Sequence, residues 1–85
     1  MPQISRFYGI IIYLYFQDHN PHFHAWYGEY KCQINIFDLS ILAGRLPNRA
    51  FALVLEWAAL HRQELLDNWN LGKKRIPFNS IEPLP

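Results

Sequence analysis

The residues whose types and spacing could perform chemistry lie in one short stretch, Asp18-His19-Asn20-Pro21-His22-Phe23-His24. His22 and His24 are two residues apart, so in a β-strand both imidazoles leave the same face and can bind one metal ion. His19 or Asp18, in the adjoining turn, could supply a third ligand for a divalent metal such as zinc. A polar strand face that uses histidine has the same pattern, so the sequence leaves both interpretations open.

Histidine also acts as a general acid or base near neutral pH, which is what RNA cleavage without a metal requires. His22, His24 and His61 are therefore the candidate catalytic residues, and Lys31 or Arg45 could stabilise phosphate charge. His61 falls in the apolar arc of a predicted helix, where a histidine more often has a structural role. If that helix packs on the core face of the sheet, His61 lies across the sheet from the other two.

The strands predicted to hold these residues are 22–27 and 30–37, joined by Gly28-Glu29. Glycine at the first central position suits a type II′ two-residue hairpin, and this turn fixes the register. The core face then holds the cross-strand pairs Tyr27–Tyr30, Ala25–Cys32 and Phe23–Ile34. The other face, predicted to be almost wholly polar, carries His22, His24 and Trp26 opposite Asn35, Gln33 and Lys31.

The candidate binding residues on and beside that polar face are His19, Trp26, Lys31, Gln33 and Asn35. Trp26 either marks a partner surface, as a large exposed aromatic ring often does, or is covered by the C-terminal tail. Cys32 points inward in this register, so it is expected to be a small core residue.

The remaining chain predicts an α+β domain over residues 1–76, followed by an extended, proline-punctuated tail over 77–85. Residues 7–16 are continuously apolar and predict one buried strand, and a short strand is expected at about 41–45. From Asn48 to about Leu71 there is no glycine or proline, which predicts one long helix over that range with Gly72 as the C′ residue. The expected fold is a small antiparallel sheet of three to four strands packed against that helix.

The amino-acid composition of the chain excludes several classes of protein. The 85 residues are 51% hydrophobic and carry a formal net charge of +1, so the chain is neither a disordered segment nor a strongly basic nucleic-acid binder. A single cysteine excludes an intramolecular disulfide framework and favours a reducing, cytoplasmic compartment. No apolar run approaches the ~20 residues that would span a bilayer.

These motifs together resemble a bacterial family of short uncharacterised proteins, domain of unknown function 4160. The residues that carry the resemblance are Ile4–Ile10, Asp18–Ala25, Tyr27–Tyr30, Gly44, Leu46-Pro47, Leu55–Ala58, Leu60–Arg62 and Leu65–Trp69. Family members usually read His-Asn-Pro-Pro-His-Phe-His, so one proline is missing here between Asn20 and His22. The turn is shorter by one residue, which weakens the correspondence of His19 with the family pattern.

The resemblance also implies a genetic context. Such proteins are often encoded beside a second small domain of unknown function, number 2442, in an arrangement similar to a toxin–antitoxin pair. It implies a toxin-like component with that neighbour as partner, and the histidines make RNA the substrate to test. The alternatives are a non-enzymatic protein-binding or regulatory domain and a metal-binding domain that uses the histidine-rich hairpin.

Overall fold

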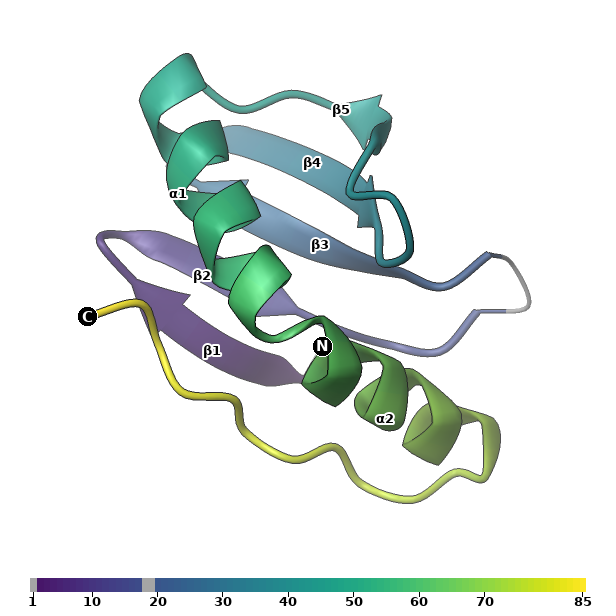
Figure 1. The fold of residues 1–85 in the computed structure, drawn as a ribbon. Coiled ribbons are helices and arrows are strands. Elements are labelled where there is room, and N and C mark those ends of the chain that lie inside the picture. The colour runs from purple at the N-terminus through teal and green to yellow at the C-terminus, as the bar shows by residue number, and fades with distance from the viewer. Residues whose placement is uncertain (1, 18–19) are drawn as a thin grey trace.

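A five-stranded antiparallel sheet and two helices make up the computed structural model, which describes residues 2–17 and 20–85. The strands lie side by side in chain order: β1 (Gln3–Phe7), β2 (Ile10–Tyr13), β3 (His22–Tyr27), β4 (Tyr30–Asn35) and β5 (Ile41–Gly44). Helix α1 (Asn48–Leu60) crosses one face of the sheet, and α2 (Arg62–Lys73) continues past the end of the sheet beside the β2–β3 connection (Figure 1). The α+β expectation is confirmed. The sheet has one strand more, and the helical region one helix more, than the sequence predicted.

The extra strand arises from a turn inside residues 7–16, the stretch predicted to be one strand. Tyr8 and Gly9 both have positive φ, 50° and 79°, and Phe7 pairs with Ile10. Positive φ at both central residues of a two-residue loop is the type I′ hairpin geometry. The single-strand prediction was wrong because one glycine in an otherwise apolar, β-branched run concealed the turn.

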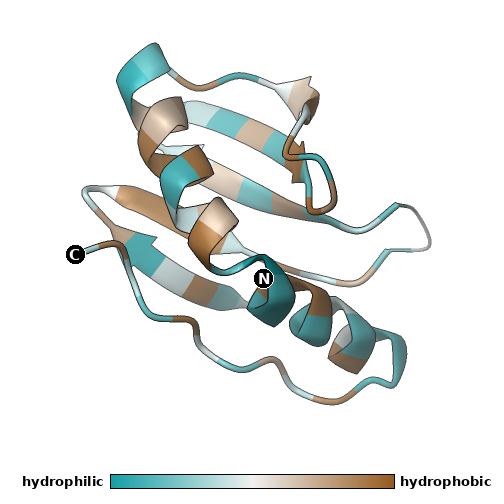
Figure 2. Cartoon of the chain, viewed as in Figure 1, coloured by the Kyte–Doolittle hydropathy of each residue, from teal (hydrophilic) through white to brown (hydrophobic). Residues whose placement is uncertain are grey.

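The β3–β4 hairpin has the register that Gly28-Glu29 predicted. Tyr27 pairs with Tyr30, and the pairing continues residue by residue to His22 and Asn35. Gly28 has a φ of 58°, the conformation for which glycine is favoured at this turn position. Hydrophobic and hydrophilic residues alternate along β4 (Figure 2), so the two faces of the sheet differ in chemistry.

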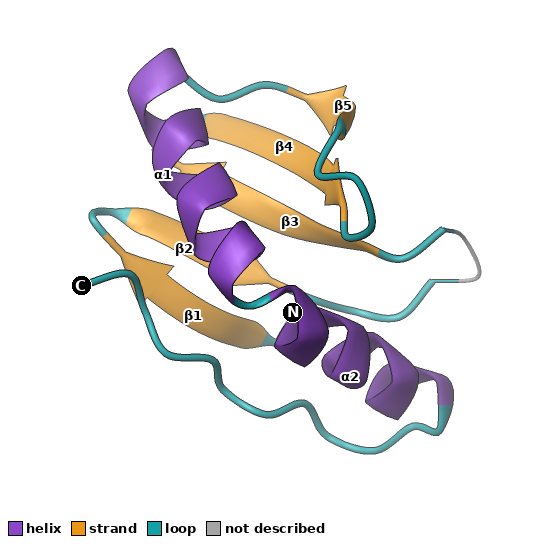
Figure 3. Ribbon diagram, viewed as in Figure 1, coloured by secondary structure: helices purple, strands orange, loops and turns teal. Residues whose placement is uncertain are grey.

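The predicted long helix is broken at His61, which has φ −120° and ψ 21° (Figure 3). The His61 amide still bonds to the carbonyls of Trp57 and Ala58, at 3.1 and 3.2 Å. Neither glycine nor proline marks the break in the sequence. The change of direction lets α1 cover the sheet while α2 covers the chain beyond the end of the sheet, where Trp69 packs on Phe16 with ring centroids 5.1 Å apart.

Gly72 does not end α2, contrary to the prediction. The helix continues to Lys73, and Arg75 has the left-handed φ of 59° that follows many helices. The amides of Arg75 and Ile76 bond back to the carbonyls of Gly72 and Leu71, which is the Schellman pattern. Gly72 is needed for space, since a Cβ there would lie 2.9 Å from Cβ of Phe16.

The hydrophobic core lies between α1 and the face of the sheet that carries Phe23. Trp57 is its centre: it is fully buried, and its ring contacts Phe7 and Phe23 with centroid distances of 5.4 and 6.0 Å. None of the described helices is long and apolar enough to cross a membrane.

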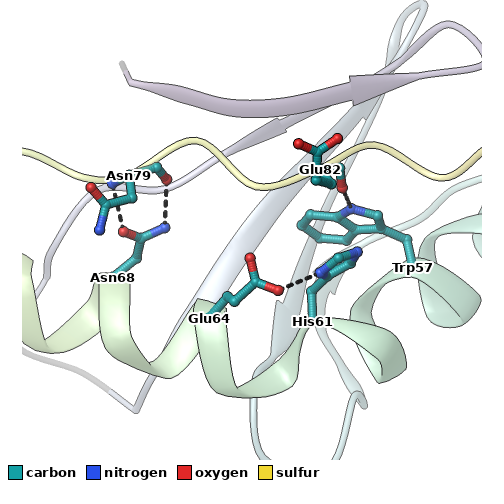
Figure 4. A network of polar contacts seen from close by, with 6 residues as sticks. All are labelled: Trp57, His61, Glu64, Asn68, Asn79 and Glu82. Atoms are coloured by element: carbon teal, nitrogen blue, oxygen red, sulfur yellow. Dashed lines mark hydrogen bonds and ion pairs between the residues drawn. The ribbon is translucent and has the colours of Figure 1, made fainter.

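The C-terminal segment has no helix or strand and is fixed to both β1 and the helices. The Ile81 amide donates to the Ile4 carbonyl at 2.8 Å, and the Trp57 indole donates to the Glu82 carbonyl at 2.8 Å. The Asn68 side chain bonds both the amide and the carbonyl of Asn79 (Figure 4). Its side chains at Ile81 and Leu84 join the core, so this segment covers the β1 edge of the sheet.

Candidate functional site

The face of the sheet opposite α1, here called the open face, holds most of the residues singled out in the sequence. Its positions follow from the pairing registers: Gln3, Arg6, Ile11, Tyr13, His22, His24, Trp26, Lys31, Gln33, Asn35 and Ala43. Helix α1 crosses the other face, and α2 lies beyond the end of the sheet (Figure 1). The predicted grouping of His22, His24 and Trp26 opposite Asn35, Gln33 and Lys31 is confirmed.

The two histidines are adjacent and buried, although they belong to the face predicted to be almost wholly polar. Their ring centroids are 5.2 Å apart, and the residues are only 2% (His22) and 7% (His24) exposed. Tyr15 stacks on His24 with centroids 4.5 Å apart, and Trp69 packs on His22 at 5.3 Å. The cause is tertiary: the chain after β2 folds over the end of the open face, and α2 brings Trp69 to it.

Both ring nitrogens of His22 have hydrogen-bond partners. Nδ1 lies 2.9 Å from the Asn20 carbonyl oxygen, and Nε2 lies 3.1 Å from Oε1 of Gln17. A ligand to either nitrogen would first have to displace one of these partners. Hydrogen bonds to two residues that precede it in the chain, Gln17 and Asn20, therefore fix the orientation of the His22 ring.

His24 differs, because its Nε2 is buried and has no hydrogen-bond partner among the described residues. Burial, and secondly the neighbouring His22, hold the pKa of His24 below its ordinary value of 6.5. The imidazole is therefore neutral near pH 7, the form that can accept a proton or a hydrogen bond.

Residues 2–17 and 20–85 contain no group of three His, Cys, Asp or Glu side chains that could hold a metal ion. The two proposed third ligands, Asp18 and His19, lie outside the described residues, as does the expected binding role of His19. Within the part of the chain that the structure describes, the metal hypothesis depends on His22 and His24.

His61 is not brought to the other two histidines. Its Nδ1 lies 2.6 Å from Oε1 of Glu64, and its ring packs on Trp57 at 5.6 Å, on the helix side of the sheet (Figure 4). This pair links the residue at the helix break to the first turn of α2. Arg45 also lies away from the open face, because its guanidinium packs over the ring of Tyr30, which belongs to the core-face row.

Two hollows indent the open face. The first has a volume of about 270 Å³ and is lined by Tyr15, His24, Trp26, Lys31 and Gln33, together with Cys32, Ala43 and Gly44. The second, about 460 Å³, is lined by Asn20, His22, Gln33 and Leu42. Gln33 borders both, so the hollows are neighbours along the strands.

Aromatic rings surround the first hollow and are partly accessible. Tyr13 packs on Trp26 with centroids 4.8 Å apart, and Nζ of Lys31 lies 4.2 Å from the Trp26 ring centroid. Tyr13, Tyr15 and Trp26 are all half-buried. Trp26 is thus flanked by a tyrosine and a lysine, while the C-terminal segment contacts β1 and the helices instead.

Charge is unevenly distributed between the two sides of the molecule. The open face carries Arg6 and Lys31, and none of its described positions is acidic. The described carboxylates lie on the helices, on the C-terminal segment and in turns: Glu29, Asp38, Glu56, Glu64, Asp67 and Glu82. A net charge of +1 therefore conceals a basic, aromatic surface.

Sequence reasoning missed Arg6, Tyr13 and Tyr15 as open-face residues. The alternation of Ile11, Tyr13 and Tyr15 with buried Ile12 and Leu14 was the available signal. It was obscured because the continuous apolar character of residues 7–16 indicates one strand buried on both sides.

Acidification should destabilise the fold through His24. Because its pKa is lowered in the folded state, the unfolded chain binds a proton first, so stability is complete above about pH 6.5 and falls as the pH drops toward the folded-state pKa. Urea unfolding followed from about pH 7.5 to 5.5 should show a decreasing midpoint, and His24→Phe should flatten that decrease. An equally steep decrease in the variant would assign the effect to other groups.

Comparison with known proteins gives one match. No curated protein sequence and no solved structure matches the chain. A family model, described as Domain of unknown function (DUF4160), matches residues 9–70. That span includes the histidine-rich strand, β4 and most of both helices. The chain therefore belongs to the DUF4160 family, as the sequence motifs indicated.

Proposed function

We propose that the protein is the toxin-like component of a bacterial two-gene module and that it acts by binding single-stranded RNA across the open face. One observation carries the proposal. The side of the sheet opposite α1 combines half-buried aromatic rings with cations and has no carboxylate at its described positions.

Stacking is the first support. Proteins that bind single-stranded nucleic acid present aromatic side chains on which bases stack, and each such contact contributes roughly 1–3 kcal/mol. Tyr13, Tyr15 and Trp26 lie on neighbouring segments of one surface. Unpaired bases can reach such a surface, whereas bases inside a duplex cannot.

The distribution of charged side chains is the second observation that supports RNA binding. Backbone phosphates require cations without nearby carboxylates, and Arg6 and Lys31 occupy the same cross-strand row, with Ile11 and Trp26 between them. The four carboxylates of the helices and the C-terminal segment belong to elements other than the strands of the open face, which limits their repulsion of RNA bound there.

Binding, rather than cleavage, is the activity we propose first, because the His22 and His24 rings are both buried. A neutral His24 has the protonation state of a general base, which would take the 2′-hydroxyl proton as the 2′-oxygen attacks phosphorus; the bond to the 5′-oxygen breaks, and that oxygen takes a proton from solvent. Tyr15 stacks over His24 and would have to move for a ribose to reach it.

A non-enzymatic protein-binding role is the second candidate, and β5 favours it. All four β5 residues are exposed, among them the large side chains of Ile41 and Leu42, and Phe37 is exposed in the turn that precedes β5. The β1 edge is covered by the C-terminal segment, so β5 is the edge that a strand of the neighbouring gene's product could extend.

RNA binding is tested by fluorescence anisotropy with a labelled single strand of about 12 nucleotides, within the range that one compact domain contacts. Trp26→Ala should weaken binding on the order of tenfold, by loss of one stacking platform. Lys31→Gln should reduce the slope of log affinity against log salt by roughly 0.7, by loss of one phosphate contact. Arg62→Gln, an exposed cation on α2, is the matched control and should retain the wild-type slope. Absence of wild-type binding at low salt would reject the RNA proposal.

The same variants connect binding with toxicity. Expression without the neighbouring gene should arrest growth, and Trp26→Ala should relieve the arrest while Arg62→Gln should not. If His22→Ala with His24→Ala relieves the arrest while the protein stays folded and still binds RNA, the histidines act in catalysis. Harmless overexpression of the wild-type protein would favour the β5 protein-binding role.

A further inference from the structure

Gln33 differs from the other open-face residues because it lies between the two hollows. It borders both hollows, and in its cross-strand row it lies between His24 and Ala43. Its side-chain amide has no hydrogen-bond partner among the described residues, and the side chain is half-buried. The small neighbours Ala43 and Gly44 leave the space beside it unfilled.

The walls of the first hollow suit a flat heterocycle. Tyr15 and Trp26 line it, His24 lies under Tyr15, and the Lys31 ammonium is held over Trp26 at 4.2 Å. A volume of about 270 Å³ is enough for one nucleobase. Rings of this kind provide stacking surfaces that accept any base, so discrimination between bases requires a hydrogen-bonding group.

We infer that Gln33 is the specificity-determining residue of the open face and that it reads an adenine placed in the first hollow. An amide presents one donor and one acceptor side by side, and adenine is the base with which glutamine characteristically forms two hydrogen bonds. Lys31, whose ammonium lies over the Trp26 ring in the free protein, turns away from that ring to contact the phosphate of the same nucleotide. This inference rests on the RNA binding proposed above.

The second hollow receives the adjacent nucleotide. It adjoins the first at Gln33, and its other lining residues are Asn20, His22 and Leu42. Asn35, although on the open face, is committed elsewhere, because its Oδ1 accepts from the amides of Phe37 and Asp38 at 2.7 and 3.3 Å. Gln33 is therefore the amide on β4 that is available to a base.

The test compares labelled strands of oligo(A), oligo(U) and oligo(C), each of about 12 nucleotides. The wild-type protein should prefer oligo(A) by about fivefold or more, the discrimination that one bidentate pair provides. Gln33→Met keeps the length of the side chain and removes both polar atoms, so it should bind the three strands nearly equally while retaining the wild-type salt slope. Gln63→Met, on the exposed face of α2, is the matched control and should retain the preference.

The outcomes separate the two proposals. If no strand binds to the wild-type protein, the proposed function fails and this inference fails with it. If all strands bind equally to the wild-type protein, or if Gln33→Met still prefers oligo(A), RNA binding stands and the role of Gln33 is rejected.

Discussion

Gly44→Ala should lower the free energy of unfolding by about 3 kcal/mol or more, the range of severe point substitutions. Gly44 has a φ of +72°, and a Cβ at this position would collide with the carbonyl oxygen of Lys31. A non-glycine residue in the left-handed region costs roughly 1–2 kcal/mol by itself. The collision adds to this cost, because the oxygen belongs to the backbone of β4 and can move only if β4 and β5 separate. Urea unfolding at neutral pH measures the change.

Gly28→Ala is the matched control for that prediction. Gly28 also has a positive φ, +58°, but at the tip of the hairpin nothing lies within 4 Å of the position that a Cβ would take. Its alanine variant should lose about 1 kcal/mol, from the backbone conformation alone. Equal losses in the two variants would show that the close approach of Gly44 to β4 is unimportant.

Trp57→Ala should lower the free energy of unfolding by about 3–5 kcal/mol, as large-to-small changes of buried aromatic residues do. Trp57 is 0% exposed and contacts Phe7 of β1 and Phe23 of β3. Its indole also donates to the Glu82 carbonyl. The substitution therefore opens a cavity between α1 and the sheet and releases one attachment of the C-terminal segment. Urea or thermal unfolding gives the magnitude.

The variant Trp57→Phe separates the loss of core packing from the loss of the hydrogen bond to Glu82. It retains most of the packing but removes the indole N–H, so its cost should be smaller, at about 1–2 kcal/mol for the lost hydrogen bond and the reduced volume. Hydrogen exchange of the Ile81 amide, which is bonded to the Ile4 carbonyl, should become faster in this variant. Unchanged protection at Ile81 would mean that the indole does not help to hold the segment on β1.

Local patterns in the sequence predicted the β3–β4 hairpin well. Gly28-Glu29 set the turn, and strict alternation along β4 set which side chains share a face, so the register from Tyr27–Tyr30 to His22–Asn35 was available without coordinates. Turn residues and the alternation of side chains determine structure only within one hairpin. It therefore grouped the histidines, Trp26, Lys31 and Gln33 correctly.

Features that depend on distant segments could not be predicted in the same way. The break at His61 has no glycine or proline, because it is imposed by what the two helices must cover. Burial of His22 depends on Trp69, which lies in α2, far along the chain from β3. The net charge of the chain does not show which face of the sheet each charged side chain occupies. The basic character of the open face is therefore seen only once the pairing of the strands is known.

The order of the strands in the sheet has a kinetic consequence. Each strand pairs with its neighbour along the chain, so the sheet can grow by successive short loop closures, which favours rapid folding. The hydrogen bond between Ile81 and Ile4, in contrast, joins nearly opposite ends of the sequence. Because this contact closes a long loop, we expect it to form late in folding. Interactions absent from the transition state act mainly on the unfolding rate, so the C-terminal segment prolongs the lifetime of the native state more than it hastens its formation.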